Sequence, residues 1–265
     1  MAGTPMLEIK NLGKRFPARA GREPPPWIIQ DMSFEVAAGE LLTIVGPSGA
    51  GKSTLLNIIA QIETASAGEI VFDGEHIASP EQKALHPGLN RRIGYVTQDD
   101  NLLPWRTTID NVLFPLEVQD TLDDAARARA QELIGAVGLA GFERYYPHEL
   151  SGGMRKRAAL IRTLVYDPPM ILMDEPFAAV DAQTRTQLQE DLLRLWSLKR
   201  KTIIFVTHDI TEAIALGDRA LVLTQRPARI AAEHPIPIPR PRQVKDIFTM
   251  PGFAAIYAGI RADVQ

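Results

Sequence analysis

The chain has 265 residues, 45% of them hydrophobic and 23% charged, so it can bury one large core or two intimate subdomains. Its formal net charge of −3 excludes bulk attraction to nucleic acid. The lack of cysteine excludes disulfides and thiolate chemistry and fits a cytosolic protein. Residues 1–5 lack the basic-then-apolar pattern of a secretory leader, and no apolar run approaches the ~20 residues that span a bilayer. A role at a membrane would therefore need a partner protein.

The predicted elements alternate between strand and helix, which favours an α/β fold. Residues 7–16 and 28–36 are predicted to be exposed strands on either side of a proline-rich loop at 17–26. Short apolar runs predict buried parallel strands, because a strand covered on both faces shows no polar alternation. These runs are 41–45, 170–173, 203–206 and 221–223. Residues 187–199 predict a helix with one core-facing stripe.

A helical subdomain is expected inside this α/β core. Residues from about 102 to 164 favour helix and contain no convincing strand. Further on, the proline-rich run 235–241 predicts an extended linker, and a short helix is expected from Pro251. The chain shows no internal repeat.

A phosphate-binding loop is predicted directly after the first strong strand. The motif G-x-x-x-x-G-K-[ST] is met by Gly46, Pro47, Ser48, Gly49, Ala50, Gly51, Lys52 and Ser53. Its glycines let backbone N–H groups turn toward phosphate, and Lys52 reaches the β- and γ-phosphates. Ser53 offers a hydroxyl to Mg²⁺, and Thr54 adds an α-phosphate contact. A chance Gly/Ser turn is the alternative. The loop alone leaves kinases, GTPases, helicases and transport ATPases open.

An acidic strand end supplies the second half of the predicted chemistry. The strand at 170–173 runs into Asp174 and Glu175. Asp174 can hold Mg²⁺ through water, and Glu175 is the expected general base for the water that attacks the γ-phosphate. Two acidic residues also commonly close a strand, so this assignment depends on the phosphate loop.

A second phosphate cradle carries the resemblance to a family. Ser151, Gly152 and Gly153 precede a basic helix beginning at Arg155, and this run resembles the signature of ATP-binding cassette (ABC) proteins. The resemblance implies a head-to-tail homodimer, in which the Ser151 segment of one subunit closes over ATP held by Lys52 of the other. One chain does not need two γ-phosphate cradles for a single nucleotide.

The resemblance assigns roles to four further residues, each of which alone would more often be structural. Gln98 matches the family's Gln loop, which touches Mg²⁺ and the attacking water and senses the membrane partner. Asp181 matches the D-loop that crosses the dimer. His208 matches the switch residue that contacts the γ-phosphate, and Phe16 matches the ring that stacks on adenine.

Other segments are similar to the nitrate/sulfonate/taurine group of bacterial importers. They are 99–105, 146–150, 182–185 and the tail 240–260. This likeness implies a peripheral subunit at the cytoplasmic face of the inner membrane, with a separate permease and an extracytoplasmic solute-binding protein. Three features depart from the family pattern: Arg155 replaces a Gln, Val180 replaces a Leu, and the loop at 17–26 is long.

The family fold is an α/β P-loop NTPase (RecA-like) core with a mainly parallel sheet, an N-terminal antiparallel β part and an inserted α-helical subdomain. The expected division of the single nucleotide-binding domain 1–265 is a catalytic core at about 1–100 and 165–234, a helical subdomain at about 101–164, and a C-terminal extension at 235–265. The predicted cofactors are ATP and Mg²⁺.

The predicted function is ATP hydrolysis that powers import of a small anionic solute such as nitrate, sulfonate or taurine. An ATPase of a lipid-trafficking or efflux system is the main alternative. A soluble ABC ATPase of DNA repair and a binding-only module are disfavoured, the latter because Lys52, Glu175 and His208 are all present. Residues 98–105, with Leu103 and Trp105, are the expected contact with the membrane partner. Alternatively, Trp105 lies inside the helical subdomain.

Overall fold

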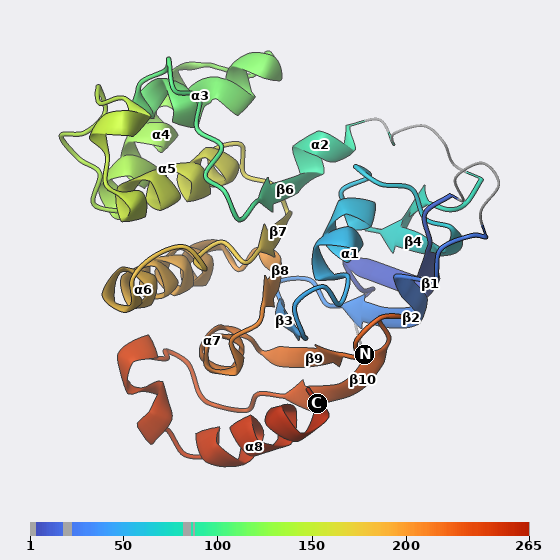
Figure 1. The fold of residues 1–265 in the computed structure, drawn as a ribbon. Helices are drawn as coiled ribbons and strands as arrows, with labels where there is room; N and C mark the ends of the chain where they lie inside the picture. The colour runs from blue at the N-terminus through green and yellow to red at the C-terminus, as the bar shows by residue number, and fades with distance from the viewer. Residues whose placement is uncertain (1–3, 18–22, 82–85, 87, 265) are drawn as a thin grey trace. The chain divides into compact units, whose positions relative to one another are not determined.

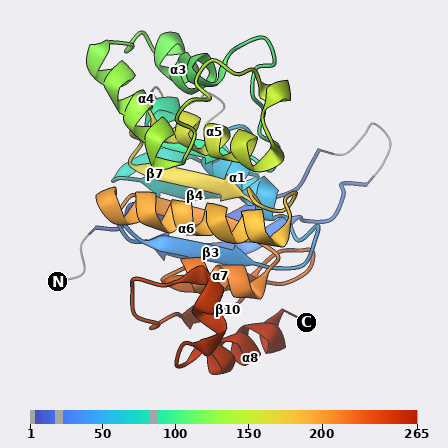
Figure 2. The same ribbon diagram turned by 90° about the vertical axis from the view of Figure 1, so that its left-hand side faces the viewer.

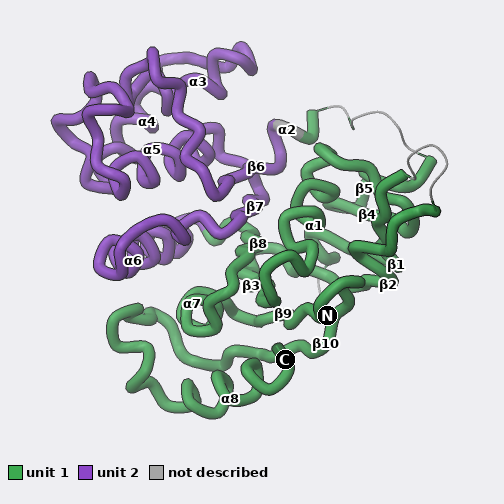
Figure 3. Tube along the Cα trace, in the orientation of Figure 1, with its two compact units in different colours: residues 1–89, 200–265 green, residues 90–199 purple. Residues whose placement is uncertain are grey.

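The structure, a computed structural model, describes residues 4–17, 23–81, 86 and 88–264. It falls into two compact units, one formed by residues 1–89 and 200–265 (unit 1) and one by residues 90–199 (unit 2) (Figure 3). Two segments on which predictions were made lie outside the described residues. They are residues 1–3, at the start of the chain, and residues 18–22 of the predicted proline-rich loop. The finer division into core, helical subdomain and extension stays a prediction.

Unit 1 begins with an antiparallel sheet in the strand order β2-β1-β4-β5. The strands are β1 (Leu7–Lys14), β2 (Ile29–Val36), β4 (Ala67–Phe72) and β5 (Glu75–Ala78). Burial alternates along the second half of β2, as expected of a strand with one buried face. This sheet confirms the predicted antiparallel β part and adds β4 and β5, which were not predicted.

The central strand of unit 1 is buried along its whole length. β3 (Leu41–Val45) runs parallel to β8 (Thr202–Thr207) on one side and to β9 (Arg219–Leu223) on the other. The unpredicted strand β10 (Ile230–Pro235) pairs antiparallel with β9. Figure 1 shows α1 (Lys52–Ile59) directly after β3, and α7 (Ile210–Leu216) connects β8 to β9. The near-continuous apolar runs thus form a parallel sheet, as predicted.

The C-terminal segment is part of unit 1, and the prediction of a linker at 235–241 is wrong. Ile236 and Ile238 are each only 3% exposed, because alternate residues of this extended run face the unit. The segment continues through the 3₁₀ helix η2 (Val244–Thr249) to α8 (Phe253–Asp263), which lies against α7 and β10 (Figure 2). The predicted terminal helix is confirmed.

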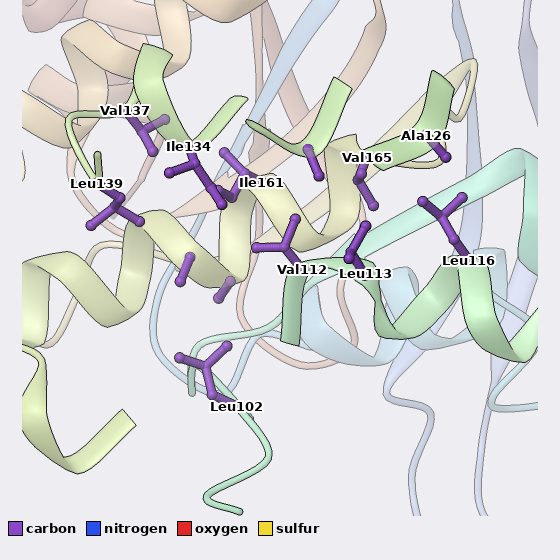
Figure 4. Packing of buried hydrophobic residues seen from close by; sticks show 13 residues of the cluster. Leu102, Val112, Leu113, Leu116, Ala126, Ile134, Val137, Leu139, Ile161 and Val165 are labelled. Atoms are coloured by element: carbon purple, nitrogen blue, oxygen red, sulfur yellow. The ribbon is translucent and has the colours of Figure 1, made fainter. Parts of the chain in front are cut away.

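Unit 2 is mostly helical, as predicted for residues 102–164. Its helices are α3 (Thr108–Val118), α4 (Asp124–Ala136), the 3₁₀ helix η1 (Pro147–Glu149), α5 (Gly152–Leu164) and α6 (Ala182–Lys199). Figure 4 shows α3, α4 and α5 sharing one apolar cluster, with Val112, Ile134 and Ile161 fully or almost fully buried. Side-chain oxygens of Thr107 and Asp123 cap α3 and α4.

Two parallel strands accompany these helices in unit 2. β6 (Ile93–Val96) follows the short helix α2 (Leu89–Arg92), and β7 (Met170–Asp174) follows α5. Val96 lies opposite Met173, so the two strands end at the same edge. Among the described residues, no helix is both long and apolar enough to cross a bilayer.

Candidate active site

Unit 1 carries the predicted phosphate loop between β3 and α1. The loop leaves the carboxyl end of a buried strand that has parallel neighbours on both sides, a common position for ligand loops. Gly46 is closely packed, because a Cβ would come within 3.1 Å of the Leu223 Cβ and 3.2 Å of the Leu223 carbonyl oxygen, so a larger residue would push Leu223 aside. Gly51 has a φ of 101°, which residues with side chains rarely adopt.

The ammonium group of Lys52 lies beneath this loop. Lys52 is 4% exposed, and its Nζ donates hydrogen bonds to the carbonyl oxygens of Gly46 (2.8 Å) and Pro47 (3.0 Å). Ser48 and Gly49 form the exposed tip. The inner side of the loop therefore binds the ammonium group of Lys52, whereas the tip of the loop is exposed to solvent.

The first turn of α1 adds side-chain hydroxyl groups and backbone N–H groups to the site. Ser53 is exposed and Thr54 is half-buried in this turn. The unpaired N–H groups at a helix start and the helix dipole both favour an anion. Together with Lys52, this donor set fits a triphosphate. The Ser53 hydroxyl is a hard oxygen ligand of the kind that Mg²⁺ prefers, so the residues present also fit this ion.

His208 leaves the same sheet edge as the phosphate loop. Val45 at the end of β3 lies opposite Thr207 at the end of β8, and His208 follows as an exposed residue. Asp209 caps α7 by accepting a hydrogen bond from the backbone N–H of Thr211 at 2.8 Å. The structure therefore brings the predicted switch residue and the loop together on neighbouring strands.

Phe16 lies two residues after β1 and is 41% exposed. The Nζ of Lys14 is 5.0 Å from the centre of the Phe16 ring. Lys14 is itself buried and bonds to the Glu63 carboxylate (2.9 Å) and the Thr64 carbonyl (2.7 Å). An exposed ring held beside a fixed cation can stack on a base, but the adenine contact of Phe16 stays a prediction.

Unit 2 carries the acidic strand end. Asp174 is the last residue of β7, and both Asp174 and Glu175 are half-buried. Glu175 has a φ of 44°, a left-handed conformation that is uncommon outside glycine and concentrates at functional sites. Burial, and then the nearby Asp174 carboxylate, raises the pKa of Tyr95 on β6. Sequence reasoning did not identify this neutral phenol near Asp174.

Gln98 follows β6 as an exposed residue, and helix α5 holds the loop that contains it. The Nζ of Lys156 donates to the Gln98 carbonyl, and Arg155 Nε lies 3.1 Å from the Asp100 carboxylate. Arg162 Nη2 donates to the Asp100 carbonyl at 2.8 Å. Arg155, a departure from the family pattern, therefore has a partner in this loop.

The signature segment forms the start of α5. The Ser151 hydroxyl caps the helix by accepting from the Met154 N–H at 3.3 Å. A Cβ on Gly153 would lie 2.6 Å from Thr184 Cγ2, so a larger residue here would force the Thr184 side chain or α6 to shift. The exposed Ser151 lines a pocket of about 400 Å³ within unit 2. Its lining is Ser151, Gly153, Met154, Arg157, Gln183, Thr184 and Gln187.

Asp181 is exposed just before α6. Its carboxylate accepts from the Thr184 backbone N–H at 3.0 Å, and hydrogen bonds from Thr184 lower the pKa of Asp181. Arg185 donates to the carbonyls of Phe177 and Val180 at 3.3 and 3.2 Å. These contacts give the predicted D-loop a defined course after Glu175.

Trp105 lies on the surface of unit 2. Its side chain is 72% exposed, so the alternative in which Trp105 is buried in the helical subdomain is wrong. Leu103 nearby is half-buried, with its backbone N–H bonded to the Asn111 side chain at 2.7 Å. Exposure of Trp105 leaves the predicted partner contact available.

A further side chain at the phosphate loop was not identified from the sequence. Arg226, in the turn between β9 and β10, donates from Nε to the Gly49 carbonyl at 2.7 Å. The two residues are 177 positions apart in the chain, so no local motif could reveal this contact.

Comparison with known proteins identifies the family of this chain. The profile of the ABC transporter family matches residues 29–178. An uncharacterised ABC transporter ATP-binding protein from Methanocaldococcus jannaschii is 44% identical over 236 residues, covering 89% of this chain and 84% of that protein. An aliphatic sulfonates import ATP-binding protein from Bacillus cereus is 39% identical over 236 residues, covering 88% of each.

Another relative is the taurine import ATP-binding protein of Yersinia pestis bv. Antiqua, 42% identical over 202 residues and 76% of both chains. Among solved structures, a dimeric bacterial ABC transporter cassette matches with a TM-score of 0.74 and 31% identity, over 87% of this chain and 99% of that one. The same cassette in a post-hydrolysis state with ADP and Pi matches with a TM-score of 0.73. This likeness confirms the predicted fold class.

Proposed function

This chain belongs to the ABC transporter family as an ATP-hydrolysing subunit, and we propose that it powers the import of a small sulfonated solute such as an aliphatic sulfonate or taurine. Identity of about 40% to two ATP-binding proteins named for these imports, over most of each chain, carries this proposal. The same alignments do not favour lipid trafficking or efflux.

Unit 1 binds the nucleotide in the proposed mechanism. The triphosphate lies on the N–H groups of residues 46–51 and on the start of α1, with Lys52 neutralising charge on the β- and γ-phosphates. Thr54 contacts the α-phosphate, and Phe16 stacks on the adenine. The buried Lys52, already fixed beneath the loop, supports this assignment because a preset cation needs little reorganisation.

The proposed general base, Glu175, belongs to unit 2. Glu175 accepts the proton of the attacking water, and His208 of unit 1 orients the γ-phosphate. Ser53, Gln98 and Asp174 would hold Mg²⁺, which would neutralise negative charge on the triphosphate. The left-handed Glu175 supports this role, since such strain persists where a side chain must point in a required direction.

A head-to-tail homodimer completes the proposed site. Ser151, Gly152 and Gly153 of one subunit close over the nucleotide of the other, and Asp181 lies in the crossing loop. The start of α5 lies beside an open pocket, and this supports the proposal because a helix N-terminus favours an anion. Loss of the γ-phosphate removes these contacts and lets the dimer open.

The proposed partners are permease subunits and a solute-binding protein outside the membrane, with this chain peripheral at the cytoplasmic face. The exposed Trp105 and the loop of Gln98 form the proposed permease contact. Gln98 reads the nucleotide state, and Trp105 fills a groove of the partner.

Growth on defined sulfur sources tests the import proposal. The gene is deleted from its host, and cells are grown on taurine, an alkanesulfonate or sulfate as sole sulfur source. We expect loss of growth on a sulfonated source alone, rescue by the wild-type gene, and no rescue by the Glu175→Gln variant. A tagged chain in mild detergent is expected to retain a polytopic permease.

Two results would overturn the import proposal. Unchanged growth on every sulfonated source, together with normal sulfonate uptake, would exclude this solute class. Recovery of lipid-handling partners with the tagged chain would move the motor to lipid trafficking while leaving the nucleotide site as described.

A further inference from the structure

The turn between β9 and β10 lies beside the phosphate loop and is held by several hydrogen bonds. Thr224 closes this turn: its hydroxyl donates to the Pro227 carbonyl at 2.9 Å and accepts from the Arg229 N–H at 3.0 Å. Ala228 is also fastened to the start of β2, since its N–H donates to the Ile28 carbonyl at 2.7 Å. These hydrogen bonds therefore fix the backbone position from which a side chain of this turn extends.

The Arg226 side chain extends from this turn to Gly49 at the tip of the phosphate loop. Its Nε donates to the Gly49 carbonyl at 2.7 Å, within the range of a good hydrogen bond. Gly49 is exposed, has a φ of 77°, and has no atom within 4 Å of the position that a Cβ would occupy. No side chain packs against the Cβ position of this glycine, and Arg226 supplies a long-range hydrogen bond to its backbone.

The bond from Arg226 continues into the loop. The peptide whose oxygen accepts from Arg226 donates through the Ala50 N–H to the Pro47 carbonyl at 3.2 Å. The same Pro47 oxygen accepts from Lys52 Nζ at 3.0 Å. Hydrogen bonds in such a chain polarise one another, so Arg226 influences the group that holds Lys52.

We propose that Arg226 is a positioning residue that preorders the phosphate loop for the nucleotide. Fixing a backbone residue costs conformational entropy, and a glycine at the loop tip has the most conformational freedom to lose. A loop ordered in advance does not incur this cost on binding, so it binds the phosphates more tightly. The inference needs only nucleotide binding by this chain and does not rest on what the transporter carries.

Nucleotide affinity of the purified full chain tests this role, with MgADP as the probe in isothermal titration calorimetry. Arg226→Ala is expected to weaken affinity roughly 3- to 10-fold, equivalent to about 0.7–1.4 kcal/mol at 1.4 kcal/mol per tenfold. Arg226→Gln keeps an N–H donor at the same distance from Cα without the charge, and is expected to restore at least half of the lost affinity on a logarithmic scale. In ATPase assays, Arg226→Ala should raise KM by a similar factor and change kcat less than about twofold.

Arg229 provides a matched control in the same turn. It is exposed, and within the described part of the chain its side chain makes no hydrogen bond or ion pair. Arg229→Ala removes the same charge and is expected to leave MgADP affinity unchanged. Wild-type affinity in Arg226→Ala, or an equal loss in the Arg226→Ala and Arg229→Ala variants, would overturn the proposal. The second outcome would mean that general electrostatic attraction, not the bond to Gly49, assists binding.

Discussion

The two units hold their functional residues in different ways. In unit 1 the phosphate loop belongs to a buried sheet: β3 is fully buried, and Lys52 bonds to backbone carbonyls of its own loop. In unit 2 the predicted site residues Gln98, Glu175 and Asp181 lie in exposed or half-buried loops, and side chains such as Arg155 and Arg185 hold these loops. Predicted site residues that are built into a sheet and those carried on loops should respond differently to substitution.

The largest expected effect separates binding from hydrolysis. Glu175→Gln in unit 2 is expected to lower kcat by about 10²- to 10⁴-fold, because the general base is lost, while nucleotide affinity stays near that of the wild type. Lys52→Met in unit 1 is expected to weaken nucleotide affinity itself. Steady-state ATPase assays and equilibrium titration with ATP measure the two effects. A Glu175→Gln variant with normal turnover would show that another group activates the water.

A buried cation sharpens the comparison within unit 1. Arg242 is 7% exposed and donates to the carbonyls of Ile214, Gly217, Ile236 and Ile238. Burial, followed by repulsion from Arg240, lowers the pKa of Arg242 to about 10, so the group remains charged at neutral pH. Arg242→Met would leave four carbonyls without this donor and is expected to lower the free energy of unfolding by about 3 kcal/mol.

Urea denaturation followed by circular dichroism measures this loss. Lys245→Met, an exposed cation in the same segment, is the control and is expected to change stability by less than about 0.5 kcal/mol. Equal stability of the Arg242→Met and Lys245→Met variants would contradict a structural role for the buried arginine.

The smallest effect concerns the close approach of α5 and α6 in unit 2. Gly153→Ala places a methyl group 2.6 Å from Thr184 Cγ2 and is expected to cost about 1–3 kcal/mol of stability through overpacking. Thr184→Ser removes that methyl group but keeps the hydroxyl, so the double variant should regain most of the loss. Gly152→Ala is the control, since its nearest neighbour, Arg155 Nη2, is 4.0 Å away. Urea unfolding curves give the stability of the wild type, the three single variants and the double variant. If Thr184→Ser does not restore the stability lost in Gly153→Ala, the two side chains do not clash.

Local sequence patterns were sufficient to predict the phosphate loop and the strand and helix that flank it. The phosphate loop could be predicted because its glycines, lysine and serine are consecutive and must follow a strand, and β3 and α1 confirm that setting. β4, β5 and β10 were missed because each contains a glutamate among its apolar residues and so lacks a long continuous apolar run. The segment with Ile236 and Ile238 was misjudged because proline spacing indicates an extended chain but not what covers it.

The sequence by itself determined which residues are predicted to meet phosphate, since the residues of the phosphate loop are neighbours in the chain and their spacing is set by the backbone. Only the tertiary structure decided that Arg226 reaches Gly49, that Arg242 is buried among four carbonyls, and that Gly153 faces Thr184. These contacts join residues that are far apart in sequence. They depend on which surfaces the folded units bury, and no local periodicity encodes that information.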